Sequence, residues 1–446
     1  MKRMKPRVTR RGPMTQVGVS IQTRRLLPLV LATMASQALL VILAPTIVEV
    51  GREFGVSVGA IGQSRSVLAG ASILSSLAIA PFLDRLGIRP LLSWGAVLAI
   101  MGSAGAALSP SLTVFLSVHA LIGVSFSCLL SAGFAGVAKF PREEQAWTMS
   151  YVVGANALAW IVVNPLAGVL TDALSWRTAY AVPAAIALCV LVSARFAPDG
   201  STTGAPGVGR GLRYVIADRS ARYWLVAEAI AFFAWGANLT FTGAFFIERY
   251  GIRESTVGLL LALGAAMFFM ASVRGAPLLR HLPRPRLIAT TALLTGAMIA
   301  LQFNAHEMLW IALLAWLLGA VAGGIRSSVS PSLGLAQLPD QPGSMMAART
   351  AANQIGYLLG GLFGGAALVW SDYGALGLAL GAAMILVAAL ILRVNDPLAQ
   401  ELQEIDKPAV STGRTVRCRQ GGIYKSNPTK PSATSSIDRR TATLRP

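Results

Sequence analysis

One carboxylate and several basic side chains interrupt otherwise apolar stretches of the sequence, and they are the first candidates for chemistry. Glu228 follows Arg222 by six residues inside such a stretch, and Arg326 and Arg349 occur in two later stretches. A carboxylate in a low-dielectric environment binds a proton more readily than it does in water, so Glu228 can serve as a proton-coupling group. The same three residues can equally form a permanent, purely structural ion pair.

A histidine and a further arginine occur within two other apolar stretches. His119 is a second candidate for proton coupling, because imidazole titrates near neutral pH. It can instead be a neutral histidine that hydrogen-bonds to a neighbouring helix. Arg65 lies at a similar depth, and its long side chain can extend outward to the membrane surface.

Amide and indole side chains recur at one depth in four apolar stretches. At 1.5 Å per residue, most of them lie about 14–18 Å from the end of the stretch that we predict to be cytoplasmic, which is the middle of a bilayer, and Trp160 lies slightly beyond. They would line a central cavity that holds an amphipathic small molecule, although indoles also pack and amides also bond between helices. The candidate substrate-binding residues are Gln37, Asn156, Trp160, Trp235 and Asn353.

The elements that carry these residues are long apolar segments. The chain of 446 residues is 54% hydrophobic and only 13% charged, which leaves too little polar surface for a water-soluble protein. Each segment of 18 or more residues can cross a hydrocarbon layer of about 30 Å as a helix. We therefore predict an all-α polytopic membrane protein with twelve spans, at residues 26–48, 58–83, 91–109, 112–138, 146–171, 178–196, 222–247, 256–279, 287–304, 309–335, 345–370 and 375–393.

The basic residues predict the orientation of these spans. The chain has 38 Lys and Arg against 19 Asp and Glu; 30 of the basic residues fall in the two ends and the loops after even-numbered spans, and 4 in the other loops. Cytoplasmic loops are enriched in Lys and Arg, so we expect both termini in the cytoplasm and the protein in the inner (plasma) membrane. This explains the positive charge without a nucleic-acid partner.

The chain also matches itself at an offset of 196 residues. Gly55 falls on Gly251, Gly62 on Gly258 and Gly168 on Gly364. We predict two pseudo-symmetric six-helix halves, an arrangement typical of secondary transporters, with the binding site between them. The predicted parts are a basic cytoplasmic segment 1–25, bundles 26–196 and 222–393, a cytoplasmic linker 197–221 and a disordered basic tail 394–446.

Residues 80–89 read APFLDRLGIR and resemble the loop between helices 2 and 3 of the major facilitator superfamily. Asp84, Arg85, Gly87 and Arg89 match the family pattern at the right spacing, and the resemblance extends over residues 26–393. It implies that this loop stabilises one alternating-access state through charge contacts. The alternative is a positively charged turn with no further role.

The resemblance to the twelve-helix drug:proton antiporter branch is weaker. Where that branch has an Arg-x-x-Gln-Gly motif in helix 4, this chain has His119, Ile122 and Gly123. Of the glycine-rich antiporter motif in helix 5, only Pro165 and Gly168 remain.

These observations predict a secondary transporter that moves a small organic molecule by alternating access, with proton-coupled efflux as the first hypothesis. Proton-coupled uptake by symport is the alternative, and a polytopic membrane enzyme is a third one that would need a catalytic cluster in the loops. The sequence shows no catalytic cluster, metal-binding pattern or nucleotide motif, so we expect no cofactor. The expected partners are the substrate, protons and the lipid bilayer, with the chain acting as a monomer.

Overall fold

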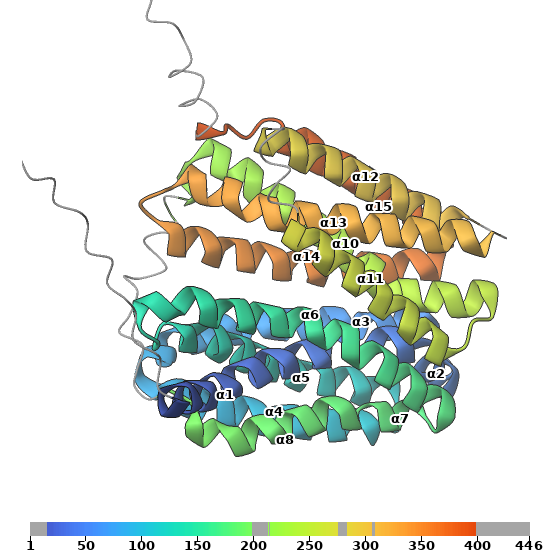
Figure 1. Ribbon diagram of the computed structural model, residues 1–446. Coiled ribbons are helices and arrows are strands. Elements are labelled where there is room, and N and C mark those ends of the chain that lie inside the picture. Colours follow the sequence, from blue (N-terminus) through green and yellow to red (C-terminus); the bar gives the residue numbers. More distant parts are fainter. Residues whose placement is uncertain (1–15, 199–212, 214, 275–282, 306–307, 398–446) are drawn as a thin grey trace, which may run out of the picture. The chain divides into compact units, whose positions relative to one another are not determined.

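The computed structural model describes residues 16–198, 213, 215–274, 283–305 and 308–397, and is helical over most of that length (Figure 1). The side chains of Asp84 and Arg85 lie outside the described residues, as do most of the predicted linker and tail. The helices are α1 Gln16–Val41, α2 Leu43–Phe54, α3 Val58–Leu86, α4 Ile88–Ala107, α5 Leu112–Val137, α6 Arg142–Ala173, α7 Trp176–Ala179, α8 Ala181–Ser193, η1 Ala194–Phe196, α10 Arg219–Tyr250, α11 Glu254–Arg274, α12 Arg284–Asn304, α13 Leu309–Gln337, α14 Pro342–Trp370 and α15 Tyr373–Ile391.

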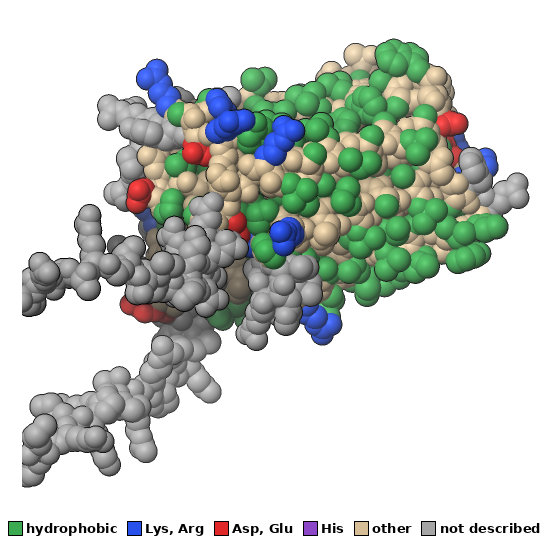
Figure 2. Space-filling view, turned by 90° about the horizontal axis from the view of Figure 1, so that it is seen from above, with side chains coloured by type: hydrophobic (Ala, Val, Ile, Leu, Met, Phe, Trp, Pro, Cys, Tyr) green, Lys and Arg blue, Asp and Glu red, His purple; other side chains and the backbone are tan. Residues whose placement is uncertain are grey.

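These helices make up the twelve predicted spans. The first span is divided into α1 and α2, and the sixth into α7, α8 and η1. Among the described residues, eleven of these spans are long and apolar enough to cross a membrane. The remaining span, α3, is not among the eleven. Figure 2 shows apolar side chains over much of one face, with charged side chains near its ends. Such an apolar belt is what a bilayer requires.

The spans form two groups that pack mainly within themselves. Helices α1 to α8 contact one another, and α10 to α15 contact one another. The two groups appear as two layers in Figure 1. They meet chiefly along two helix pairs, α3 with α14 and α6 with α11. Under the internal repeat the two pairs are equivalent, which agrees with two pseudo-symmetric halves.

The repeated sequence features have repeated structural roles. Gly55 and Gly251 end α2 and α10 in the left-handed conformation, at φ +65° and φ +63°, which glycine adopts without strain. Arg89 donates through Nε to the Ala197 carbonyl oxygen at 2.9 Å, after the last helix of the first half. In the second half, Arg284 donates through Nε to Asp396 at 3.0 Å. In each half, an arginine of the third span therefore binds the chain segment that follows the sixth span of that half.

Glycines bring the two halves into backbone contact at one end, the end that carries Phe54, Ala173 and Tyr250 and that we predict to be periplasmic. A Cβ added at Gly168 of α6 would lie 2.3 Å from the Glu254 carbonyl oxygen of α11. An added Cβ at Gly59 of α3 would lie 2.4 Å from the Gly365 carbonyl oxygen of α14. Only glycine permits such an approach, so the halves are tightly closed at this end.

Candidate substrate cavity

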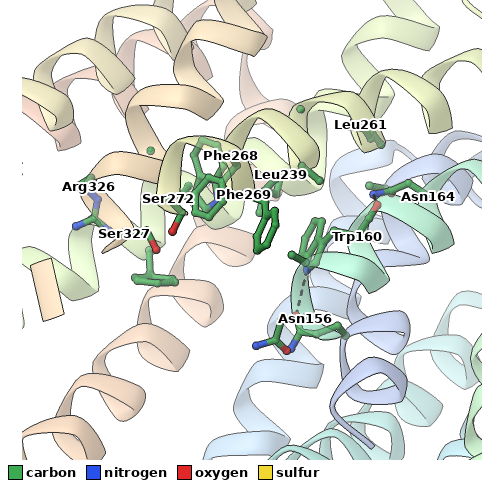
Figure 3. A pocket seen from close by; sticks show the side chains of 18 of the residues that line it. Asn156, Trp160, Asn164, Leu239, Leu261, Phe268, Phe269, Ser272, Arg326 and Ser327 are labelled. Carbon is green, nitrogen blue, oxygen red and sulfur yellow. Dashed lines mark hydrogen bonds between the residues drawn. The ribbon is translucent and has the colours of Figure 1, made fainter. Parts of the chain in front are cut away.

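A cavity of about 430 Å³ lies between the two halves, at the level where the amide and indole residues were predicted to meet. Its volume falls within the range of small-molecule sites. Helices α1 and α6 supply a mainly polar wall, whereas α10, α11 and α13 supply a mainly aromatic one (Figure 3). The two walls come from different halves, so a relative movement of the halves must change the cavity.

The wall of the first half is built from side-chain amides around one indole. Trp160 donates through Nε1 to Gln37 Oε1 at 3.1 Å, and Asn164 donates through Nδ2 to the Trp160 carbonyl oxygen at 2.7 Å. Within the described residues, Oδ1 of Asn156 and of Asn164 has no hydrogen-bond partner. Both oxygens are buried, so their lack of a partner is costly, and a polar group that reached them through the cavity would stabilise this wall.

The wall of the second half is an aromatic stack. The ring of Trp235 lies 5.5 Å from that of Phe268 at 27° and 6.1 Å from that of Trp316 at 12°. Trp316 is held in place by its Nε1 hydrogen bond to the Leu260 carbonyl oxygen at 3.2 Å. Parallel rings of this kind offer a flat surface for a planar ligand.

Four of the five predicted substrate-binding residues line this cavity: Gln37, Asn156, Trp160 and Trp235. Asn353 is outside the lining, and its Oδ1 has no partner among the described residues. Sequence reasoning missed Phe268 and Trp316. Phe268 lies near the middle of its span, at a depth similar to that of Trp235. Depth could therefore have identified it if phenylalanine had been considered together with the amides and indoles.

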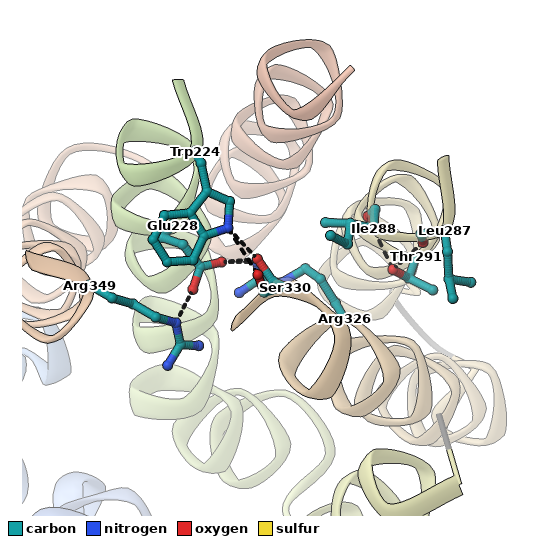
Figure 4. A network of polar contacts seen from close by, with 8 residues as sticks. All are labelled: Trp224, Glu228, Leu287, Ile288, Thr291, Arg326, Ser330 and Arg349. Atoms are coloured by element: carbon teal, nitrogen blue, oxygen red, sulfur yellow. Dashed lines mark hydrogen bonds and ion pairs between the residues drawn. The ribbon is translucent and has the colours of Figure 1, made fainter. Parts of the chain in front are cut away.

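Glu228 lies at the centre of a buried charge network beside the cavity (Figure 4). Its Oε1 accepts from Arg326 Nη1 at 2.7 Å and from Ser330 Oγ at 2.9 Å, and its Oε2 accepts from Arg349 Nε at 2.7 Å. The Glu228 side chain is fully buried, while 18% of the Arg349 side chain is exposed. The network joins α10, α13 and α14, and Arg326 is also part of the cavity lining.

The predicted coupling residue His119 lies apart from the cavity, in an aromatic cluster of the first half. Its Nδ1 is 2.8 Å from the Phe115 carbonyl oxygen, to which it can only donate, and its Nε2 is 3.4 Å from the Tyr180 hydroxyl. Trp176 packs against Phe115 and Tyr180. With Nδ1 donating to that carbonyl, a neutral ring leaves Nε2 to accept from the Tyr180 hydroxyl, so both nitrogens are satisfied without a second proton. The geometry therefore supports the structural alternative for His119.

The interpretation that Arg65 extends to the membrane surface is wrong. Its side chain is buried between the halves, where Nη1 donates to the Leu40 carbonyl oxygen and the guanidinium lies 5.4 Å from the Tyr357 ring. Its Nε has no hydrogen-bond partner within the described residues, and no carboxylate there forms an ion pair with it. The close packing of α3 against α14 confines this side chain, and Tyr357 of α14 lies against its guanidinium.

The predicted gating loop is described only in part. Asp84 and Arg85 have side chains outside the described residues, so their role remains a prediction. Gly87 adopts φ +79° between α3 and α4, which permits the tight reversal that the pattern predicts. Arg89 binds the chain after the sixth span, as described above.

Comparison with known proteins identifies the family and several relatives. The family model that matches is that of the Major Facilitator Superfamily, at residues 29–333 and 225–433. The transcription regulatory protein OpdE of Pseudomonas aeruginosa is 27% identical over 49% of this chain and 56% of its own length. The multidrug resistance protein MdtM of Salmonella typhimurium is 30% identical over 34% of this chain and 38% of its own. These matches span about half or less of each relative.

Two longer matches cover most of the chain. The purine ribonucleoside efflux pump NepI of Salmonella paratyphi C is 23% identical over 76% of this chain and 86% of its own length. The crystal structure of a D-xylose-proton symporter superposes with a TM-score of 0.67 at 15% identity, over 84% of this chain and 98% of that one. The structural match shows a shared fold.

Proposed function

Because this chain belongs to the Major Facilitator Superfamily and is a multi-pass membrane transporter, we propose that it exports a small organic molecule in exchange for protons. The observation that carries the proposal is the cavity between the two halves, with a buried ionisable network at its wall. The names of the relatives MdtM and NepI, a multidrug resistance protein and an efflux pump, support the outward direction.

Alternating access follows from the way the halves meet. They are closed by glycine contacts at the predicted periplasmic end, while the cavity extends toward Val153, Ser272 and Val273 near the other end. Rocking about the α3–α14 and α6–α11 contacts would open the closed end and close the other. A substrate bound to the polar and aromatic walls would then face the opposite side of the membrane.

Glu228 is the proposed coupling group, and α14 connects it to the movement. Arg349 on α14 contacts Glu228, and Gln354 on the same helix donates to Ser72 Oγ of the other half at 2.9 Å. A rocking movement that breaks the contact between the halves can therefore displace Arg349. Glu228 then keeps Arg326 and Ser330 on Oε1, while Oε2 loses its partner in a buried site, and a proton from solution can take the place of Arg349 there.

Inverted membrane vesicles test the direction and the coupling together. With an acidified interior, which corresponds to the periplasm, export in exchange for protons should accumulate labelled adenosine or another compound from a panel of labelled ring compounds. Uptake by symport would move the same compound out of preloaded vesicles. Trp235→Ala should alter which compounds accumulate, because it removes the centre of the aromatic stack. If dissipating the pH gradient leaves accumulation unchanged, proton coupling is excluded.

The orientation of the chain is part of the proposal, since the charge pattern supports it. Reporter fusions placed after Arg222 and at Pro446 should both report a cytoplasmic location, because 30 basic residues lie on that side and 4 on the other. A fusion after Arg177, in the short helix α7 at the start of the sixth span, is the control and should report the periplasm. Periplasmic activity at either of the first two sites would overturn the topology.

A further inference from the structure

The charges around the cavity are unbalanced. Three guanidinium groups approach its lining, those of Arg65, Arg326 and Arg349, whereas Glu228 is the carboxylate that offsets them. No Asp or Glu is part of the described cavity lining. The local balance is therefore positive, in a site where low dielectric makes charge interactions strong.

The positive groups also lie against two of the aromatic rings that line the cavity. Arg326 and Arg349 lie 5.9 Å and 5.7 Å from the Phe232 ring, and Arg65 lies 5.4 Å from the Tyr357 ring. Phe232 and Tyr357 line the cavity and pack edge to face, with ring centroids 5.5 Å apart. The chain's own cations thus already use the cation–π positions of this pair.

The rest of the cavity suits a ring without a positive charge. Phe268 and Trp235 offer apolar ring surface on one wall, and the buried Trp316 supports them from behind. On the other wall, the amide of Asn156 has an unused acceptor for a ligand N–H or O–H. Arg326 gives Glu228 a hydrogen bond from Nη1, so other guanidinium N–H groups remain for a ligand oxygen.

From this arrangement we propose that the cavity binds planar ring compounds that carry hydrogen-bonding groups and no positive charge, and that it rejects organic cations. The proposal rests on the transport function proposed above, and it names the substrate class of that cavity. It predicts discrimination by charge between compounds that share one ring system.

Matched compounds measure this discrimination directly. Binding of adenosine against 1-methyladenosine, and of nicotinamide against 1-methylnicotinamide, can be measured on the purified full-length protein by titration calorimetry near pH 7. In each pair a single N-methyl group turns the neutral ring into a cation. We expect the cation to bind at least about tenfold more weakly, because it meets an unbalanced positive charge. Equal or tighter binding of the cations would overturn the proposal.

A single isosteric substitution should largely cancel the preference. Asn156→Asp places a carboxylate on the cavity wall with almost no change in shape, and the expected result is a gain of about tenfold in affinity for the methylated cations. Asn395→Asp, at an exposed position beyond α15, adds the same charge outside the cavity and should leave the preference of the wild type. If the two variants behave alike, the cavity charge does not set the selectivity.

Binding and transport separate this proposal from the proposed function. If the charge preference holds in binding but inverted vesicles accumulate none of the neutral compounds, the transport proposal fails and the selectivity stands. If vesicles accumulate 1-methyladenosine as well as adenosine, the selectivity fails and transport stands.

Discussion

Replacing Glu228 with Gln should abolish pH-driven accumulation of substrate while substrate exchange across the membrane continues. The amide keeps the size of the side chain and can still accept one hydrogen bond from Arg326 or Ser330, but it cannot take up a proton. Exchange needs only the rocking of the halves with substrate bound. Accumulation needs a proton to cross in the other direction, so the two measurements separate coupling from transport.

The network could instead be a fixed structural pair, and the same variant distinguishes the two roles. Removing one partner of a buried ion pair typically costs about 3–5 kcal/mol, because the remaining charges are left without compensation. A purely structural pair therefore predicts loss of folded protein, seen in thermal unfolding, with loss of exchange and accumulation together. Normal accumulation by a folded Glu228→Gln variant would exclude the coupling role.

Ser330→Ala is the matched control for this experiment. It removes one hydrogen bond to Glu228 Oε1 and the Nε1 contact from Trp224 to the hydroxyl, but it leaves both arginines in place. A hydrogen bond of this kind contributes about 0.5–3 kcal/mol. We expect a small loss of stability with coupling retained. The comparison shows whether the protonatable group or the general packing of the network matters.

The sequence predicted the fold and part of the cavity because both depend on position along the membrane normal. Apolar length located the spans, and rise per residue placed Gln37, Asn156 and Trp235 at one depth. Rise per residue gives no rotation about the helix axis, however. His119 therefore turned out to face an aromatic cluster, and Asn353 lies outside the lining, although their depths suited a cavity.

Tertiary packing decides which partners a side chain contacts, and depth in the membrane alone does not. Arg65 is buried because α14 packs over it at Tyr357, and nothing near Arg65 in the sequence indicates that contact. The same holds for Glu228: depth placed two arginines within reach, but the structure shows that both bind it at once. The internal repeat was more informative, because three of its matched glycines, Gly62, Gly168 and Gly258, lie at contacts between the halves.

A second large effect is expected at one of those contacts: Gly168→Leu should slow transport strongly without unfolding the protein. At Gly168 an added Cβ would lie 2.3 Å from the Glu254 carbonyl oxygen, a backbone atom that no rotamer change can move away. The reciprocal glycine, Gly258 on α11, would bring an added Cβ within 2.4 Å of the Asn164 carbonyl oxygen. A large side chain at this crossing must hold the halves apart at the predicted periplasmic end.

Each half keeps its own packing in the Gly168→Leu variant, so we expect normal insertion into the membrane. We expect the transport rate to fall by at least about tenfold. Such a fall requires the closed state to be destabilised by only about 1.4 kcal/mol. Gly154→Leu is the control on the same helix, because an added Cβ there meets nothing within 4 Å.

A cysteine at Leu261, which lines the cavity near the closed end, reports the conformation. In a chain without its natural cysteines, it should react with a membrane-impermeant maleimide from the periplasm in the Gly168→Leu background and much more slowly in the Gly154→Leu background. Equal labelling of the two would show that the glycine crossing does not close the cavity.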